Sequence, residues 1–172
     1  IATSAMLLAI LIGVSLGTIA AIKETKVVDR GILTLSTLGV TIPNFVLAPI
    51  LVYFFALKMD LLPVTWEAKL RAPELFYLIL PVITLSLRPT ALLTRLTRAS
   101  MVETLKQEFI RTAIAKGVPP RRMYLRHGLR NAILPVITAV GTSYGFLLTG
   151  SFVVETAFLL PGIGSKTIDA IR

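Results

Sequence analysis

The chain of 172 residues has no cysteine, only one histidine and few charged side chains. The absence of cysteine excludes a scaffold held together by disulfides. Charged residues make up 16% of the chain and hydrophobic residues 55%, whereas soluble domains average about 25% and about 45–50%. This composition also excludes an intrinsically disordered chain. The mean hydropathy of +0.81 is typical of a membrane protein.

Four apolar segments are candidates for membrane-spanning helices. Residues 1–22 carry no charge and would form a helix about 33 Å long, against a hydrocarbon core of about 30 Å. Residues 31–57, also uncharged, would be about 40 Å long as one helix, so we expect Pro43 and Pro49 to kink it. Residues 75–94 form a third span if Arg88 is included, and residues 131–154 a fourth. We therefore predict an all-α integral membrane protein, a polytopic helical bundle.

The basic residues indicate how these spans are oriented. If the spans alternate in direction, twelve Lys and Arg fall on one side, in residues 23–30 and 95–130. The other side has five, which are Lys58, Lys69, Arg71, Lys166 and Arg172. Because cytoplasmic loops are enriched in Lys and Arg, we predict that residues 95–130 form a cytosolic loop. Its net charge of +7 is most of the chain's +9, so the positive charge reflects topology and does not indicate a nucleic-acid surface.

The ends of the sequence resemble cut ends. The chain opens inside an apolar segment without an initiator Met. We therefore expect residues 1–172 to be one transmembrane domain from the middle of a larger membrane protein, with four of about six spans.

The cytosolic loop has its own predicted structure. Residues 97–115 can continue the third span as one helix, which Gly117 and Pro119 then interrupt. Proline is favoured at the first position of a helix, so we expect a short helix over residues 120–129. Leu125 and Leu129 would share one face of it and suit docking to another protein. The alternative is that the positive-inside rule alone explains a basic loop.

Several stretches of sequence carry a family resemblance. The chain has RLTRASM at 95–101, FIRTAIAKG at 109–117, RHGLRNAILP at 126–135, VETAF at 154–158 and PGIG at 161–164. These stretches resemble the inner-membrane permease subunits of bacterial binding-protein-dependent ABC importers, in particular the dipeptide, oligopeptide and nickel group. With the hydrophobic pattern, the likeness covers nearly the whole chain.

The resemblance implies a multi-pass subunit of the bacterial inner membrane that imports short peptides or a related small solute. Nickel, opines and glutathione remain alternatives. It also implies a sister permease subunit, two ATP-binding cassette ATPase subunits, an extracytoplasmic solute-binding protein and membrane lipid as partners. ATP and Mg²⁺ would be bound by the ATPase and no cofactor by this chain.

The cytosolic signature of this superfamily reads Glu-Ala-Ala, three residues, Gly, nine residues, then Ile-x-Leu-Pro. Aligned on Gly117, only Ala113, Gly117 and Leu129 agree with it, and the departures are typical of the peptide and nickel branch. The resemblance implies that the ATPase couples through this element. The candidate coupling residues are Arg111, Thr112, Ala113, Gly117, Arg121, Arg122, His127, Leu129 and Arg130. A second interpretation of Gly117 is a glycine that only ends a helix.

No catalytic or metal-binding set can be assembled from the sequence, so we do not expect an enzyme. Residues 162–167 resemble a phosphate-binding loop, but Leu160 and Ser165 occupy positions where that motif requires glycine. His127 is the only imidazole of the chain, and one imidazole does not make a nickel site.

Polar residues within the spans are candidates for a translocation pathway. They are Asn44, Arg88, Thr142 and Tyr144. The alternative is that these side chains bond to neighbouring helices and that Arg88 extends toward the membrane surface. Two pairs of glycines four residues apart, Gly13 with Gly17 and Gly141 with Gly145, would allow helices to approach closely.

Two other classes of membrane protein are alternatives. An ion-coupled secondary transporter would need acidic groups within the spans or inverted repeats with broken helices, and the sequence has neither feature. A membrane scaffold whose basic loop binds anionic lipid is the second alternative.

Overall fold

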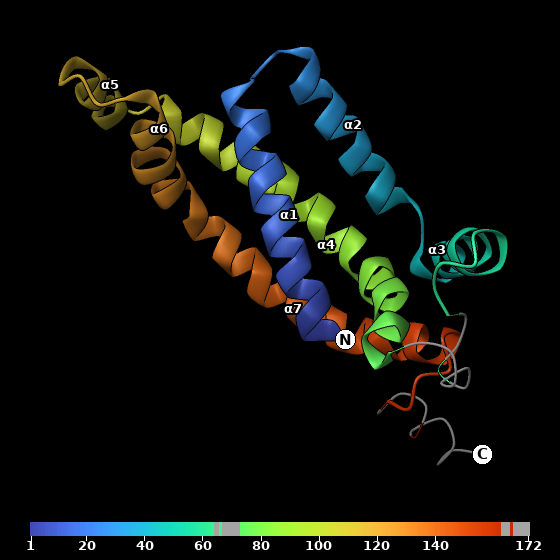
Figure 1. Cartoon of the computed structure of the whole chain (residues 1–172). Coiled ribbons are helices and arrows are strands. Elements are labelled where there is room, and N and C mark those ends of the chain that lie inside the picture. Colours follow the sequence, from blue (N-terminus) through green and yellow to red (C-terminus); the bar gives the residue numbers. More distant parts are fainter. Residues whose placement is uncertain (64–65, 67–72, 163–165, 167–172) are drawn as a thin grey trace. The chain divides into compact units, whose positions relative to one another are not determined.

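The computed structural model describes residues 1–63, 66, 73–162 and 166, and these residues form helices without any strand (Figure 1). Predictions made for Lys69, Arg71, Arg172 and residues 163–165 fall outside them. In chain order the helices are α1 (Ala2–Ile22), α2 (Val27–Thr41), α3 (Asn44–Leu51), η1 (Val52–Lys58), α4 (Glu74–Leu105), α5 (Glu108–Ala115), α6 (Pro120–Arg122), η3 (Met123–Leu129) and α7 (Arg130–Ala157).

The chain divides into two compact units. One, here called the loop unit, contains residues 8–40 and 88–143. The other, here called the terminal unit, contains residues 1–7 and 41–87 together with the residues from 144 onward. All nine residues predicted to contact an ATPase therefore belong, with the predicted cytosolic loop, to the loop unit.

Within the described part of the chain, three helices are long and apolar enough to cross a membrane. They begin at Ala2, Leu75 and Pro120 and end at Ile22, Leu105 and Ala157. A fourth candidate is the pair of helices over residues 27–58, if the broken pair counts as one span. The first helix matches the expected residues 1–22, and α4 continues beyond the third span, which was expected to end at residue 94, as far as Leu105. The assignment of four spans stays a prediction.

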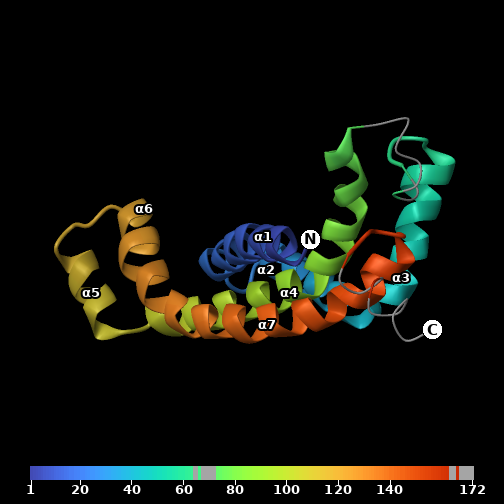
Figure 2. The same cartoon turned by 90° about the horizontal axis from the view of Figure 1, so that it is seen from below.

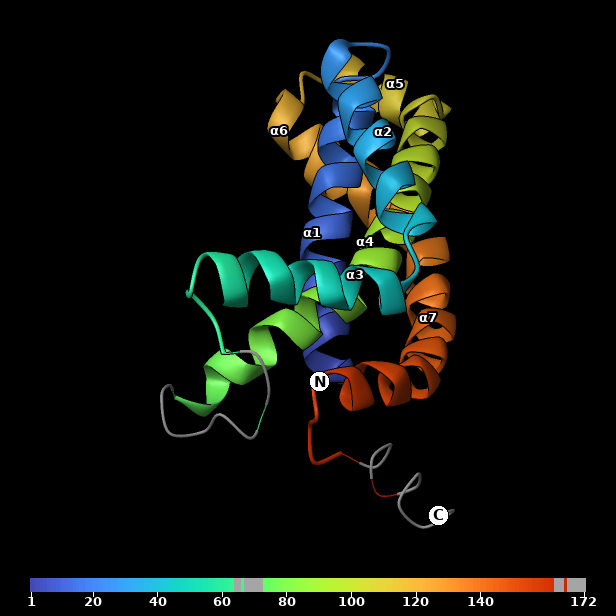
Figure 3. The same cartoon turned by 90° about the vertical axis from the view of Figure 1, so that its right-hand side faces the viewer.

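Pro43 breaks a helix that we expected it only to kink. Helix α2 ends at Thr41, and Pro43 is the extended N-cap of α3, with φ −64° and ψ 144°. Proline disfavours helical geometry in the residue before it, here Ile42, so the helix stops and begins again. Pro49 lies inside α3, which runs on into the π-helix η1 from Val52 (Figure 3).

The expectation of one helix over residues 97–115 is wrong. Helix α4 ends at Leu105, and α5 begins at Glu108 after an extended Gln107 with φ −72° and ψ 152°. The break lets α5 fold back against η3, so that Ile110 and Ala113 become buried (Figure 2). Burial of this apolar face favours the turn over continuation of the helix.

The short helix after the double proline begins where expected but winds differently. Pro119 is the N-cap and Pro120 the first residue of α6, and from Met123 the chain continues as the π-helix η3. Because π-helical bonding joins residues five apart, Met123 and Gly128 form its buried face. The expected α-helical winding is therefore wrong. Leu125 is 48% exposed, and its shared docking face with Leu129 stays a prediction.

The core of the loop unit joins α1, α4 and the start of α7. Ala21, Met101 and Ala132 form a buried cluster against which Leu129 packs. The Ser100 hydroxyl donates to the carbonyl oxygen of Ala132 over 3.0 Å. These contacts attach the two ends of the cytosolic loop to the end of α1.

Candidate functional site

Gly117 ends α5 in a defined capping geometry. Its φ is +74°, a conformation that glycine adopts without penalty. Its N–H donates to the Ile114 carbonyl over 2.9 Å, and the Val118 N–H donates to the Ala113 carbonyl over 3.1 Å. These two bonds are the Schellman pattern of helix termination. The helix-ending interpretation of Gly117 is thus confirmed, and its role in coupling stays a prediction.

The first three candidate coupling residues lie on α5 and point in different directions. Arg111 is exposed and pairs with Glu108 at 3.0 Å. Thr112 is also exposed, and its hydroxyl donates to the Glu108 carbonyl over 3.1 Å. Ala113 is buried. Two of the three side chains are therefore available to a partner, and the third holds α5 in place.

The remaining candidates lie on α6, on η3 and at the start of α7. Arg121, Arg122 and Arg130 are exposed. His127 is half-buried, and its carbonyl accepts a hydrogen bond of 2.6 Å from the Asn131 side chain. Together with Arg111, these arginines make the exposed surface basic over α5, α6 and η3, here called the hairpin, and over the adjoining start of α7.

Two exposed apolar side chains of the hairpin were not singled out from the sequence. Phe109 is 44% exposed and Ile114 is 57% exposed. They lie on α5, and Leu125 of η3 adds a third exposed apolar side chain. A surface that combines exposed apolar side chains with arginines suits docking to another protein. The stretch FIRTAIAKG at 109–117 contains more apolar residues than the buried face of α5 uses. This surplus is the sequence signal that could have identified Phe109 and Ile114.

Gly128 seats the hairpin on α4. A Cβ at this position would lie 2.8 Å from the Met101 Cε atom and 3.2 Å from the Leu105 Cδ2 atom. Met101 is fully buried. The absence of a side chain at Gly128 therefore allows the π-helix to contact α4 directly, which sequence reasoning missed.

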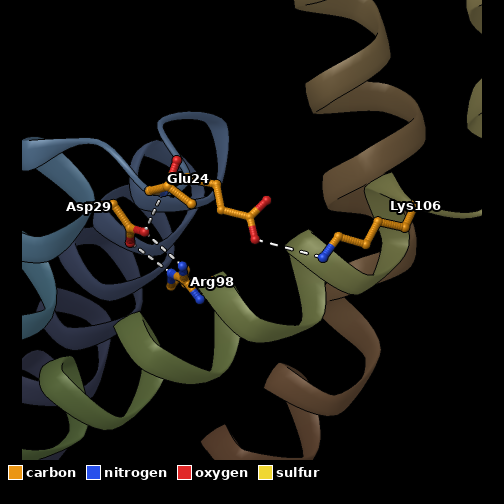
Figure 4. A network of polar contacts seen from close by, with 5 residues as sticks. Glu24, Asp29, Arg98 and Lys106 are labelled. Atoms are coloured by element: carbon orange, nitrogen blue, oxygen red, sulfur yellow. Dashed lines mark hydrogen bonds and ion pairs between the residues drawn. The ribbon is translucent and has the colours of Figure 1, made fainter.

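An ion pair that the sequence did not reveal joins α2 to α4 within the loop unit (Figure 4). The Arg98 Nε donates to Asp29 Oδ1 and the Arg98 Nη2 donates to Asp29 Oδ2, each over 2.7 Å. The Thr25 N–H donates to the same carboxylate over 3.1 Å. The Asp29 side chain is only 3% exposed and that of Arg98 is 23% exposed. The carboxylate is thus held by a bidentate fork and by the α1–α2 turn.

This pairing acts on the ionisation of Asp29, which lies in the charged stretch before the expected second span. The hydrogen bond from the Arg98 guanidinium holds the pKa of the Asp29 carboxyl below its usual range, although burial acts in the opposite direction. The Thr25 N–H lowers this pKa further. Asp29 is therefore charged in the folded protein at neutral pH. Nearby, the Lys106 Nζ lies 3.7 Å from the Glu24 Oε1, and this ion pair is more exposed than that of Asp29 and Arg98.

The four candidate pathway residues are divided between the two units. Asn44 and Tyr144 belong to the terminal unit, and Arg88 and Thr142 to the loop unit. Arg88 and Thr142 are exposed, and the Thr142 hydroxyl donates to the Ala139 carbonyl of its own helix over 3.1 Å. The Tyr144 hydroxyl lies 3.0 Å from that of Thr3. That these four side chains line one translocation pathway stays a prediction.

Metal chemistry has no support in the part of the chain that is described. No three His, Cys, Asp or Glu side chains of these residues come together as a possible metal site.

Comparisons with known proteins agree with the helical architecture expected of a membrane protein. The family described as binding-protein-dependent transport system inner membrane component matches residues 13–172. The chain belongs to this family, and it is an all-α polytopic component of the bacterial inner membrane.

Three individual relatives show which transporters of this family the chain is similar to. The chain is 42% identical over 170 residues to the dipeptide transport system permease protein DppB of Bacillus subtilis, covering 98% of this chain and 53% of the relative. It is 44% identical over 166 residues to the oligopeptide transport system permease protein OppB of Escherichia coli K12, covering 96% and 53%. A probable peptide ABC transporter permease protein of Sinorhizobium fredii, y4tP, is 41% identical over 170 residues, covering 97% and 54%. The chain thus spans about half the length of these relatives.

Proposed function

We propose that this chain is part of the membrane-spanning permease subunit of an ATP-driven importer of short peptides. The observation that carries the proposal is identity of 41–44% along nearly the whole chain to permeases whose names specify peptides, dipeptides or oligopeptides. Nickel, opines and glutathione remain the alternative solutes within the group. Peptides are preferred because these relatives are named for them.

The assembly that this function requires has four kinds of component. The permease pairs with a sister permease subunit, two ATPase subunits bind at the cytosolic face, and an extracytoplasmic binding protein delivers the solute. ATP and Mg²⁺ are held by the ATPases, and this chain performs no covalent chemistry. An ion-coupled transporter is less well supported, because residues 1–22, 31–57 and 131–154 contain no acidic side chain.

The hairpin of α5, α6 and η3 is the element that receives force from the ATPase. Exposed Arg111, Arg121 and Arg122 suit acidic groups on the partner, and the exposed apolar side chains of α5 suit a groove. Movement of the hairpin passes to α4 where Gly128 meets Met101. Gly117 sets the direction in which the chain leaves α5, and the remaining coupling candidates are His127, Leu129 and Arg130.

The experiment reconstitutes the full-length permease in proteoliposomes with its sister subunit, both ATPases and the binding protein. We expect ATP-dependent uptake of labelled di- and oligopeptides, and no uptake when the ATPases or ATP are omitted. Uptake of Ni²⁺ in place of peptide would assign the alternative solute. Peptide uptake driven by an ion gradient without ATPases would contradict the proposal.

Two substitutions at Gly117 test the coupling hairpin in the same system. Gly117→Val should uncouple ATP hydrolysis from uptake while the subunit still inserts, because a β-branched residue is strained at positive φ. Gly117→Asn is the matched control, since asparagine tolerates this conformation, and, apart from Gly117 and its two chain neighbours, no atom of the described residues lies within 4 Å of the added Cβ position. If Gly117→Val still couples ATP hydrolysis to peptide uptake as the wild type does, the hairpin does not transmit movement from the ATPase.

A further inference from the structure

Asp29 and Arg98 make a contact that stability alone does not require. Burying two charges costs free energy, and well-packed apolar residues in place of a buried pair are often as stable or more stable. The bidentate fork has a fixed direction, however, since both guanidinium nitrogens contact the carboxylate at 2.7 Å. Such a pair fixes one register between α2 and α4, which an apolar contact does not.

The turn that precedes Asp29 is held in an uncommon conformation. Thr25 has a φ of 67°, which is rare and strained for a β-branched residue. Its N–H donates to the Asp29 carboxylate, so the ion pair and the turn support one another. The turn between α1 and α2 is thereby attached to Arg98 of α4 (Figure 4).

A continuous set of contacts leads from the hairpin to this turn. Gly128 of η3 lies against Met101 and Leu105 of α4. Arg98 precedes Met101 by three residues, so the two lie on neighbouring positions of the same helix face. Arg98 then holds Asp29 of α2. All of these residues belong to the loop unit.

We infer that Asp29 and Arg98 are positioning residues, which make α2 and the α1–α2 turn follow α4 when the hairpin moves. This inference rests on the proposed importer function. In this role the pair transfers movement from the ATPase contact at the hairpin to α2, the helix that begins the second apolar segment. Without the fork, α2 would lag behind α4, and ATP would be hydrolysed without productive import.

The test measures ATP hydrolysed per peptide imported in the complete importer, with assembly yield and melting temperature measured beside it. Arg98→Lys keeps the charge but loses the fork. We expect it to assemble normally and to raise the ratio between about twofold and about thirtyfold, the usual range for residues that transmit coupling. Arg95→Lys is the matched control, because Arg95 is an exposed arginine on the same helix, and its ratio should not change.

A double variant separates positioning from stability. Asp29→Met with Arg98→Met removes both charges of the pair, so the subunit should still assemble, with a melting temperature lowered only by the loss of the hydrogen bond from the Thr25 N–H. The ratio should stay raised, because an apolar contact has no fixed register. A double variant that both assembles and couples normally would show that the pair only stabilises the fold. Failure of both Arg98→Lys and the double variant to assemble would likewise overturn the inference.

The wild-type complex distinguishes this inference from the proposed function. If wild-type protein shows no ATP-dependent peptide import, the importer assignment fails, whatever the variants do. If wild-type protein imports peptide and the Arg98→Lys ratio is unchanged, the importer assignment stands and only the positioning role is lost.

Discussion

The two glycine pairs of α1 and α7 have the same spacing but different surroundings. On α1, a Cβ at Gly13 would lie 2.9 Å from the Thr90 carbonyl oxygen, and one at Gly17 would lie 2.5 Å from that of Thr94. On α7, apart from the adjacent residues and backbone of the same helix, no atom of the described residues lies within 4 Å of a Cβ built at Gly141 or Gly145. The spacing of small residues therefore indicates that a helix can be approached closely, and it does not identify the neighbour.

The largest effect is expected where the glycine already touches backbone. Gly17→Ala would place its methyl group against the Thr94 carbonyl and the Thr97 Cβ atom. Since backbone cannot yield as a flexible side chain does, we expect a loss of about 1–3 kcal/mol in the free energy of unfolding. Thermal unfolding of the detergent-solubilised subunit measures it. A melting temperature equal to wild type would show that α1 and α4 are not packed this closely.

The glycines of α7 should respond in the opposite direction. Gly141→Ala and Gly145→Ala should each stabilise the isolated subunit by about 0.5–1 kcal/mol, because alanine loses less backbone entropy in a helix. Thermal unfolding of the subunit alone gives this value, and Gly17→Ala is the internal control. If the same substitutions lower the yield of the assembled importer, another subunit covers this face. A lower melting temperature of the isolated subunit would contradict the finding that no other described helix lies against Gly141 and Gly145.

The smallest effect concerns the hydroxyl beside Gly17. Among the described residues, the fully buried Thr97 Oγ1 has no hydrogen-bond partner. Thr97→Val keeps the shape and removes the unsatisfied hydroxyl, so we expect unfolding free energy within about 0.5 kcal/mol of wild type or slightly higher. Thr94→Val is the control, since the Thr94 hydroxyl donates to the Thr90 carbonyl over 2.8 Å and should lose about 1 kcal/mol. Equal losses in both variants would indicate a partner for Thr97.

Local signals in the sequence predicted several features correctly. The uncharged run at the start predicted α1, whose bounds are Ala2–Ile22. The double proline predicted a helix that begins at Pro120. Gly117 predicted the end of α5. Each of these features depends on a few consecutive residues whose allowed backbone angles or polarity determine the outcome.

Other features depended on contacts between distant segments. The Asp29–Arg98 pair joins residues 69 positions apart, and no periodicity marks either residue. The break at Gln107 and the π-helical winding of η3 bury Ile110 and Gly128, whereas helical spacing predicted a straight helix and an α-helical stripe. Propensity was overridden in both places by burial against neighbouring helices.

By itself, the sequence determined that the chain is helical and suited to a membrane, that a basic loop separates its last two apolar segments, and where glycine and proline stop its helices. These properties follow from the polarity and backbone limits of consecutive residues. Only the tertiary structure decided which glycines touch a neighbouring helix, which face of η3 is buried, and which arginine holds Asp29. Those choices depend on which surfaces meet in space, and the free energy of burial and pairing arises only after they meet.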